Sequence, residues 1–158
     1  MRRRLRDHTV ITYDRRGYAG SIEVPTADAV SRHVADLADI VDGDPVVAIG
    51  HSFGGVVALT FAAEFPHLTR SALVFETPLA WMPWWSGASR DVDHHPPRAD
   101  RAAAAAENFF RRVVSDEAWD RLDDETRALR RREGFALLSD LASTRLGPPF
   151  DPKAISVP

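Results

Sequence analysis

The sequence predicts an α/β fold in which a parallel β-sheet is flanked by helices and carries an inserted helical segment. Apolar β-branched runs alternate with helical patterns in the order strand, helix, strand, helix, strand, which favours parallel strands joined by helical crossovers. The run 45–49 is apolar without alternation, as in a strand that is covered on both faces. From residue 79 onward the pattern becomes helical.

The first expected elements are a strand over residues 9–13 and a turn-rich loop over 15–21. Thr26 is then expected to cap a helix that ends near Gly43. The apolar face of this helix consists of Val30, Val34, Leu37 and Val41.

The second and third strands are expected at 45–49 and 72–75, with a mostly apolar helix over 56–65 between them that Pro66 closes. Glu76 follows the third strand directly. An aromatic stretch broken by proline comes next, and after a polar loop the sequence is helical to about Ser143.

Composition limits the possible classes of protein. The 158 residues, 44% of them hydrophobic, suffice for one domain with a buried core. The net charge of −3 gives no field that would favour nucleic acid or an anionic membrane. With no cysteine there is no disulfide framework and no thiolate nucleophile. We expect a cytoplasmic protein without a signal peptide or a membrane span.

Residues 50–54 read Gly-His-Ser-Phe-Gly and match the pattern G-x-S-x-G between a buried strand and an apolar helix. A serine on such a tight turn has a strained backbone, which requires small flanking residues such as Gly50 and Gly54. The turn exposes the Ser52 hydroxyl near the positive end of the following helix. The backbone N–H of Phe53 is the expected oxyanion donor.

The segment 50–55 resembles the nucleophile elbow of the α/β-hydrolase superfamily. Its residues are Gly50, His51, Ser52, Phe53, Gly54 and Gly55. Residues 13–18, Tyr-Asp-Arg-Arg-Gly-Tyr, resemble the strand and loop that precede it. The likeness is to the esterase- and haloperoxidase-like branch and covers about residues 5–78. It implies a partial hydrolase core over 1–78, a helical cap over 79–154 and the start of the next core strand over 155–158.

The same resemblance implies a triad. The family places its acid after the strand that ends at Glu76 or after the one that begins at Ile155, and its histidine later still. All six histidines lie before that position, so we expect the sequence to be truncated at both ends and the catalytic histidine to lie beyond Pro158. As a serine needs a base and an orienting acid, the chain is expected to show little or no turnover.

Other candidate sites were weighed against plainer interpretations. Trp81, Trp84 and Trp85 either line an acyl pocket or pack the cap onto the core. Residues 91–95 hold two aspartates and two histidines, but adjacent residues rarely converge on one ion, and we expect no metal and no cofactor. The basic run 127–132 follows acidic residues at helical spacing, which favours a salt-bridged helix face.

The resulting hypothesis is a serine hydrolase that acts on a small-molecule ester or acyl substrate, with Ser52 and Glu76 as catalytic candidates. Ester hydrolysis, C–C cleavage, haloperoxidation and acyl transfer stay open. The alternatives are a non-catalytic remnant or interaction module, and a dinucleotide-binding domain, although Ser52 replaces the glycine that would approach a pyrophosphate. Bare strand edges are expected to cause self-association, and the sequence leaves the native oligomeric state open.

Overall fold

The computed structural model describes residues 7–85 and 98–158. Two strands, β1 (Val46–His51) and β2 (Thr69–Phe75), form a parallel sheet. Helix α2 (Phe53–Glu64) connects them and packs against both strands, and α1 (Val30–Val41) packs against α2. Short 3₁₀ turns are η2 (Ala19–Ser21), η3 (Pro66–Leu68) and η4 (Pro152–Ala154). The predicted α/β class with parallel strands is confirmed.

The core of this sheet region, residues 30–75, lies between α1 and α2. Its buried side chains are Val30, Val34, Val41, Val56, Val57 and Phe61. Helix α1 ends as predicted, because Asp42 and Gly43 both have positive φ, at 52° and 86°. Its predicted start is wrong: Ala29 rather than Thr26 is the N-cap, without a side-chain cap. Instead, the preceding segment turns toward α6, where Ser139 donates a hydrogen bond to the Ala27 carbonyl.

The strand predicted over residues 9–13 is wrong, since these residues form no strand and pair with neither β1 nor β2. Residues 155–158 also form no strand. The Pro158 carbonyl nevertheless accepts a hydrogen bond of 2.9 Å from Ala72 of β2. Both segments have apolar, β-branched sequences, but a strand requires a hydrogen-bonded neighbour in addition to a favourable sequence.

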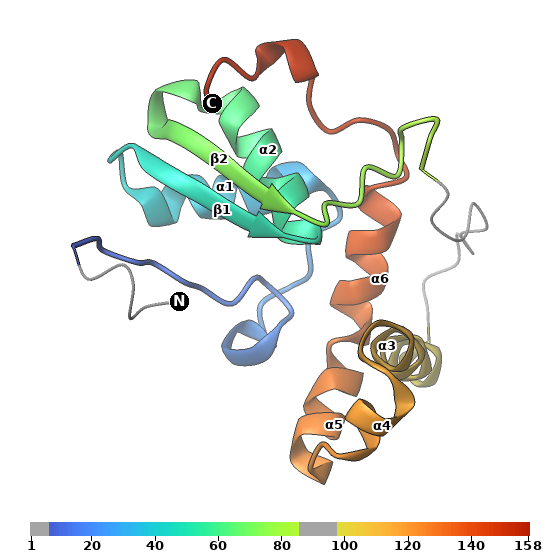
Figure 1. Ribbon diagram of the computed structural model, residues 1–158. Coiled ribbons are helices and arrows are strands. Elements are labelled where there is room, and N and C mark those ends of the chain that lie inside the picture. Colours follow the sequence, from blue (N-terminus) through green and yellow to red (C-terminus); the bar gives the residue numbers. More distant parts are fainter. Residues whose placement is uncertain (1–6, 86–97) are drawn as a thin grey trace.

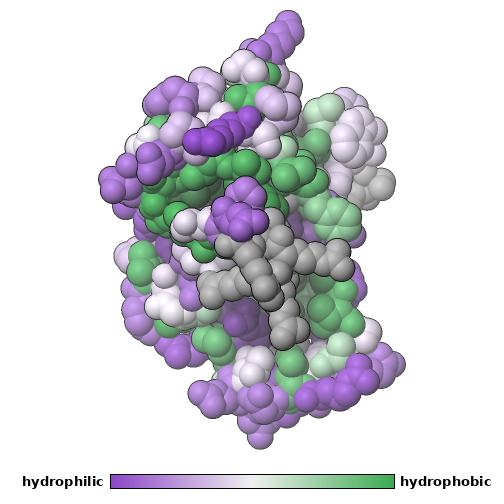
Figure 2. Space-filling view, turned by 60° about the vertical axis from the view of Figure 1, so that its left-hand side comes forward, coloured by the Kyte–Doolittle hydropathy of each residue, from purple (hydrophilic) through white to green (hydrophobic). Residues whose placement is uncertain are grey.

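The second face of the sheet is bare, so the expectation that β1 is covered on both faces is wrong for the described residues. Ile49 is 56% exposed, Leu73 56% and Phe75 66%. They alternate with residues facing the helices, because successive side chains of a strand point to opposite sides. No described helix packs on this face, and hydrophobic surface gathers over the upper part of the molecule in Figure 2.

Four helices form a second region, residues 99–143, here called the helical region: α3 (Ala99–Val114), α4 (Asp116–Asp120), α5 (Asp124–Arg132) and α6 (Gly134–Ser143). They gather beyond the carboxyl ends of the two strands (Figure 1). Trp119 is fully buried there, as are Ala102 and Ala106 of α3 and Ala136 of α6. Gly134 permits close packing, because a Cβ at this position would lie 2.0 Å from the Ala102 carbonyl oxygen.

The helical sequence predicted from residue 102 to 143 is therefore divided by three turns. Ser115 accepts a hydrogen bond from Ala118 N–H and Asp123 accepts one from Thr126 N–H, which caps α4 and α5. The predicted salt-bridged face of residues 127–132 is confirmed, as its arginines pair with Asp124, Glu133, Glu107 and Glu23.

Candidate active site

Ser52 forms the turn between β1 and α2. Its backbone has φ 52° and ψ −128°, a region that a residue with a side chain adopts only under strain. Two backbone hydrogen bonds hold this conformation: Ser52 N–H donates to the Phe75 carbonyl at 2.9 Å, and Gly55 N–H donates to the Ser52 carbonyl at 2.8 Å. The predicted strained turn between strand and helix is confirmed.

The glycines around Ser52 have different reasons to be small. A Cβ at Gly50 would lie 2.2 Å from the Gly54 carbonyl oxygen, and one at Gly55 would lie 2.0 Å from Thr77 Oγ1. A Cβ at Gly54 would meet nothing within 4 Å. The predicted steric need is therefore confirmed for Gly50 but wrong for Gly54, whose open side faces away from the turn. Gly55, rather than Gly54, is the second glycine at which a Cβ would clash with a neighbour.

Phe53 is the first residue of α2. The first N–H groups of a helix have no partner within it and lie at the positive end of its dipole. The Phe53 N–H is thus available geometrically to a developing negative charge next to Ser52. Its ring is packed by two basic side chains: the Arg15 guanidinium lies 4.7 Å from the ring centroid, and the His33 ring lies edge-on at 5.4 Å.

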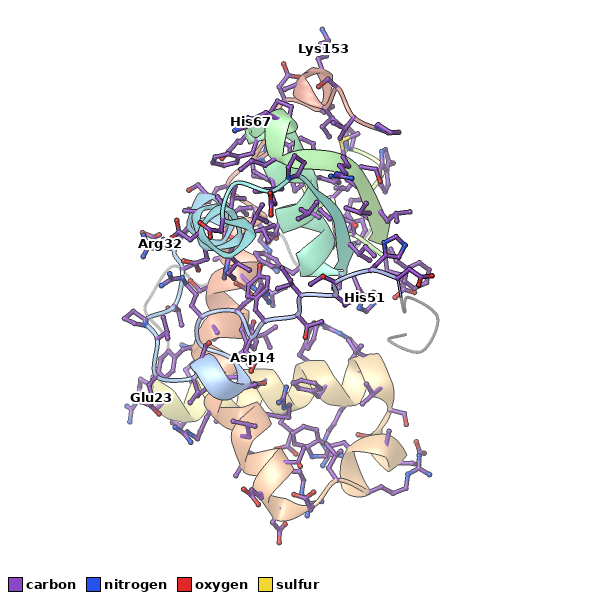
Figure 3. All side chains as sticks on the ribbon, turned by 90° about the vertical axis from the view of Figure 1, so that its left-hand side faces the viewer. Asp14, Glu23, Arg32, His51, His67 and Lys153 are labelled. Atoms are coloured by element: carbon purple, nitrogen blue, oxygen red, sulfur yellow. The ribbon has the colours of Figure 1, made fainter. Side chains whose placement is uncertain are left out.

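Glu76 and His51 meet at the carboxyl ends of the two strands. His51 pairs with Phe75 in the strand register, and its Nε2 lies 3.1 Å from Glu76 Oε2. Both side chains are about two-thirds exposed, and the His51 ring stacks on Phe75. Figure 3 shows His51 at this end of the sheet. Sequence reasoning missed the pair, although two parallel strands that end in polar residues give a signal for it.

Of the other described histidines, His33 and His67 have partners other than the Ser52 hydroxyl. His33 is buried against Asp140 at 3.0 Å, and His67 lies beside the Phe65 ring. Within residues 7–85 and 98–158, no hydrogen bond joins the Ser52 hydroxyl to an imidazole. His94 and His95, with the rest of the segment 91–95 considered for metal binding, lie outside the described residues.

The three candidate pocket tryptophans differ in environment. Trp81 is half-buried, packs against the core cluster and meets the Phe150 ring edge-on at 5.9 Å. Trp84 is exposed and contacts Trp85 edge-on. The sequence left two interpretations open, lining of an acyl pocket and packing of the cap onto the core. Packing onto the core holds for Trp81. The structure shows no such packing onto the core for Trp84.

A buried polar cluster next to Phe53 was not predicted. It consists of Arg15, Tyr18, His33 and Asp140, with Asp140 on α6 and His33 on α1. Burial, reinforced by the Asp140 carboxylate, raises the pKa of the Tyr18 phenol far above its ordinary value, so the hydroxyl remains a donor. Nothing in the sequence links Asp140 to residues 107 or more positions away, so only the folded chain reveals this junction.

A second buried carboxyl anchors the same loop. Glu133 Oε1 accepts a hydrogen bond of 3.0 Å from Ala19 N–H, and Arg130 lies 2.8 Å from its other oxygen. Burial raises the pKa of Glu133 above its ordinary value. The loop 14–21 is therefore held to the helical region by Glu133 as well as by Asp140.

Among the described residues, no group of three or more His, Asp or Glu side chains is arranged to hold a metal ion. None of the helices in the described ranges combines the length and the apolar content needed to cross a bilayer.

Comparison with known proteins places this geometry in a family. The model of the alpha/beta hydrolase family matches residues 1–154. The uncharacterized proteins Mb2734 of Mycobacterium bovis and MT2788 and Rv2715 of Mycobacterium tuberculosis are each 41% identical over 64 residues, which is 38% of this chain and 18% of each relative. The match thus spans less than a fifth of their length. No solved structure matches. With nearly its whole length matched and a strained serine turn between β1 and α2, the chain belongs to the alpha/beta hydrolase family.

Proposed function

We propose that this chain carries the nucleophile of a serine hydrolase that acts on small carboxylic esters or related acyl substrates through an acyl-enzyme. The observation that carries the proposal is the backbone of Ser52, held at φ 52° between β1 and the first turn of α2. Strain of this kind persists only where the surroundings enforce it, and it concentrates at functional sites.

Each neighbour has a role in this proposal. The Ser52 hydroxyl attacks the acyl carbonyl, and the Phe53 N–H stabilises the resulting oxyanion. Glu76 is the candidate acid, since it follows β2 at the edge of the sheet where Ser52 lies. No described histidine is hydrogen-bonded to Ser52. Turnover by the chain as written is therefore expected to be little or none.

The helical region supports a cap role for residues 79–154 over a core of residues 1–78, because α3 to α6 lie beyond the carboxyl ends of the strands (Figure 1). Residues 155–158 are the proposed start of a further strand, since Pro158 already bonds to β2. Trp81, Trp84 and Trp85 are proposed to contribute to the substrate pocket. We also propose that the protein is cytoplasmic and that it binds neither nucleic acid nor membranes.

Covalent labelling tests the nucleophile. The chain is treated with a fluorophosphonate, with and without added imidazole as an external base, and the modified residue is located by mass spectrometry. Labelling of Ser52 is expected and should be faster with imidazole, because a base must remove the hydroxyl proton. Ser52→Ala should abolish it.

The matched control is Ser71→Ala, which removes another half-buried serine, in β2, and should leave labelling unchanged. If Ser52 stays unmodified even with imidazole, the hydrolase proposal fails and a non-catalytic interaction module becomes the better interpretation. If label is found equally on several serines, the reactivity is not specific to the turn, and the proposal fails as well.

A further inference from the structure

We infer that Asp140, on helix α6 of the helical region, is a positioning residue for the Ser52–Phe53 turn, acting through Arg15 and His33. This inference rests on the proposed function, because it concerns the peptide that would bind the oxyanion. It assigns a role in the chemistry to a residue that is 87 positions away from Phe53 in the chain.

The Asp140 carboxylate collects three donors. Oδ2 accepts hydrogen bonds from Arg15 Nη1 at 2.8 Å and from the Tyr18 hydroxyl at 2.7 Å. Oδ1 lies 3.0 Å from His33 Nε2, which carries the proton because a carboxylate only accepts. The Asp140 side chain is only 5% exposed. A buried carboxylate persists only when it is paired and hydrogen-bonded, so these donors are held firmly.

The same donors hold the Phe53 ring. The Arg15 guanidinium is sandwiched between two aromatic faces, 4.6 Å from the Tyr18 centroid and 4.7 Å from the Phe53 centroid. The His33 ring meets Phe53 at 5.4 Å with planes 76° apart. Planar guanidinium stacking depends on orientation as well as on charge. Asp140 therefore fixes the two groups that pack against Phe53.

Holding the ring restricts the backbone donor of the same residue, because only the two side-chain torsions of Phe53 separate the ring from its N–H at the first position of α2. Catalytic donors must lie within a few tenths of an ångström of the developing charge, and small misplacements are costly. Ser52, immediately before Phe53, has the strained φ of 52° that its surroundings must enforce. Contact with α6 through Asp140 thus contributes to the geometry of the turn.

The experiment compares Asp140→Asn with Ser139→Ala in the full chain. Ser139 precedes Asp140 on α6 and also bonds the helix to the rest of the molecule, through the Ala27 carbonyl, but it belongs to none of the contacts with Phe53. Labelling of Ser52 by a fluorophosphonate in imidazole is followed as a function of probe concentration. The ³¹P signal of the phosphonylated serine then reports on the hydrogen bond to its oxygen.

We expect Asp140→Asn to lower the maximal labelling rate about tenfold with little change in half-saturating probe concentration, and to shift the ³¹P signal. Ser139→Ala should match the parent in both. Circular dichroism establishes that each variant is folded. If Asp140→Asn does not fold, Arg15→Lys replaces it as the test, since lysine keeps the charge but loses the planar stack on Phe53, and the same slowing is expected.

The outcomes separate the two proposals. If the parent labels at Ser52 while the folded variants label at the parent rate with an unchanged ³¹P signal, this inference is overturned and the hydrolase proposal stands. If Ser139→Ala slows labelling as much as Asp140→Asn, general loosening of α6 explains the effect, and the inference is likewise overturned. If the parent does not label at Ser52, the proposed function itself fails, and the inference with it.

Discussion

The sheet region and the helical region close their interiors by different means. In the sheet region, valines and Phe61 from two helices form a continuous apolar cluster. In the helical region the buried apolar side chains are three alanines and one large residue, Trp119. Its helices come close because Gly134 has no side chain. One region thus depends on apolar volume, and the other on close backbone approach.

Their outer surfaces differ in the same way. The helical region is surrounded by ion pairs, such as Arg111 with Glu107 and Arg131 with Glu107. The sheet region instead leaves Ile49, Leu73 and Phe75 on a bare face. The contacts between the two regions include buried polar ones centred on Asp140. This contrast suggests two separate cores that are joined by directional hydrogen bonds.

The largest expected effects come from truncating each core. Phe61→Ala and Trp119→Ala should each cost about 3–5 kcal/mol, since both side chains are fully buried. Because the cores are separate, Trp119→Ala should reduce amide protection in α3 to α6 and leave protection in β1 and α2 largely intact. Residue-level hydrogen exchange measures this. Equal loss of protection in both regions after either substitution would show a single cooperative core and end the comparison.

A smaller effect is expected from adding a methyl group where backbones meet. Gly50→Ala in the sheet region and Gly134→Ala in the helical region should each cost about 1–3 kcal/mol or more, because the contacted atoms are backbone and cannot rotate away. Gly54→Ala is the matched control. Its Cβ meets nothing within 4 Å, so it should be neutral or stabilising by up to about 1 kcal/mol. Urea denaturation gives all three values, and equal losses at positions 50 and 54 would contradict the steric account.

The ion pair that joins the loop 14–21 to α1 should make the free energy of unfolding depend on pH. The Arg16 guanidinium donates to both oxygens of Asp36, and these hydrogen bonds lower the pKa of Asp36. A lowered pKa means that the pair stabilises the fold above the ordinary pKa of aspartate and that this stability is lost as the pH falls through the lowered value.

Asp36→Asn should therefore cost about 1–2 kcal/mol near pH 7, and the difference from the parent should vanish in acid. Denaturation midpoints between pH 7 and pH 2 measure this. Asp39→Asn, at an exposed position on the same helix, should have no effect at either end. A difference between Asp36→Asn and the parent that persists at low pH would show that charge is not the cause.

The smallest effect on stability is expected on the bare sheet face. Leu73→Thr places a β-branched side chain, which strands favour, in an exposed strand position, so the free energy of unfolding should change by no more than about 0.5 kcal/mol. Self-association of the chain should nevertheless decrease, because an exposed apolar face favours contact between copies. Light scattering measures it, with Val113→Thr on α3 as an equally exposed control. A parent that is already monomeric would contradict the expectation.

Much of the sheet region could be predicted from its sequence, because short-range patterns determine it. The apolar run before Gly50 predicted β1, and the apolar helical pattern after the motif predicted α2 and the strained turn between them. Where the prediction failed, the cause was a contact between residues far apart in the sequence, or the lack of one. Residues 9–13 resemble a strand in sequence but pair with neither β1 nor β2, and the N-cap of α1 is Ala29, where the preceding segment bonds to α6.

In the candidate site, too, local patterns were predictable from the sequence and long-range contacts were not. Ser52, Phe53 and Gly50 were recognisable from a local motif whose spacing carries its own geometry. The cluster around Asp140 was not, since it joins a loop, α1 and α6 through side chains. Gly54 was misjudged because the motif does not show which glycine meets its neighbour; Thr77, which occupies the space beside Gly55, lies after the next strand.

The contact between Thr77 and Gly55 has a mechanical consequence. Thr77 fills the room that a side chain on α2 would need, and its buried hydroxyl has no hydrogen-bond partner among the described residues. The fold thus tolerates an unsatisfied polar atom at this contact. Thr77 and Gly55 therefore set how closely the segment after β2 approaches the start of α2. A larger side chain at position 55 would push these two segments apart, and with them Ser52 and Glu76.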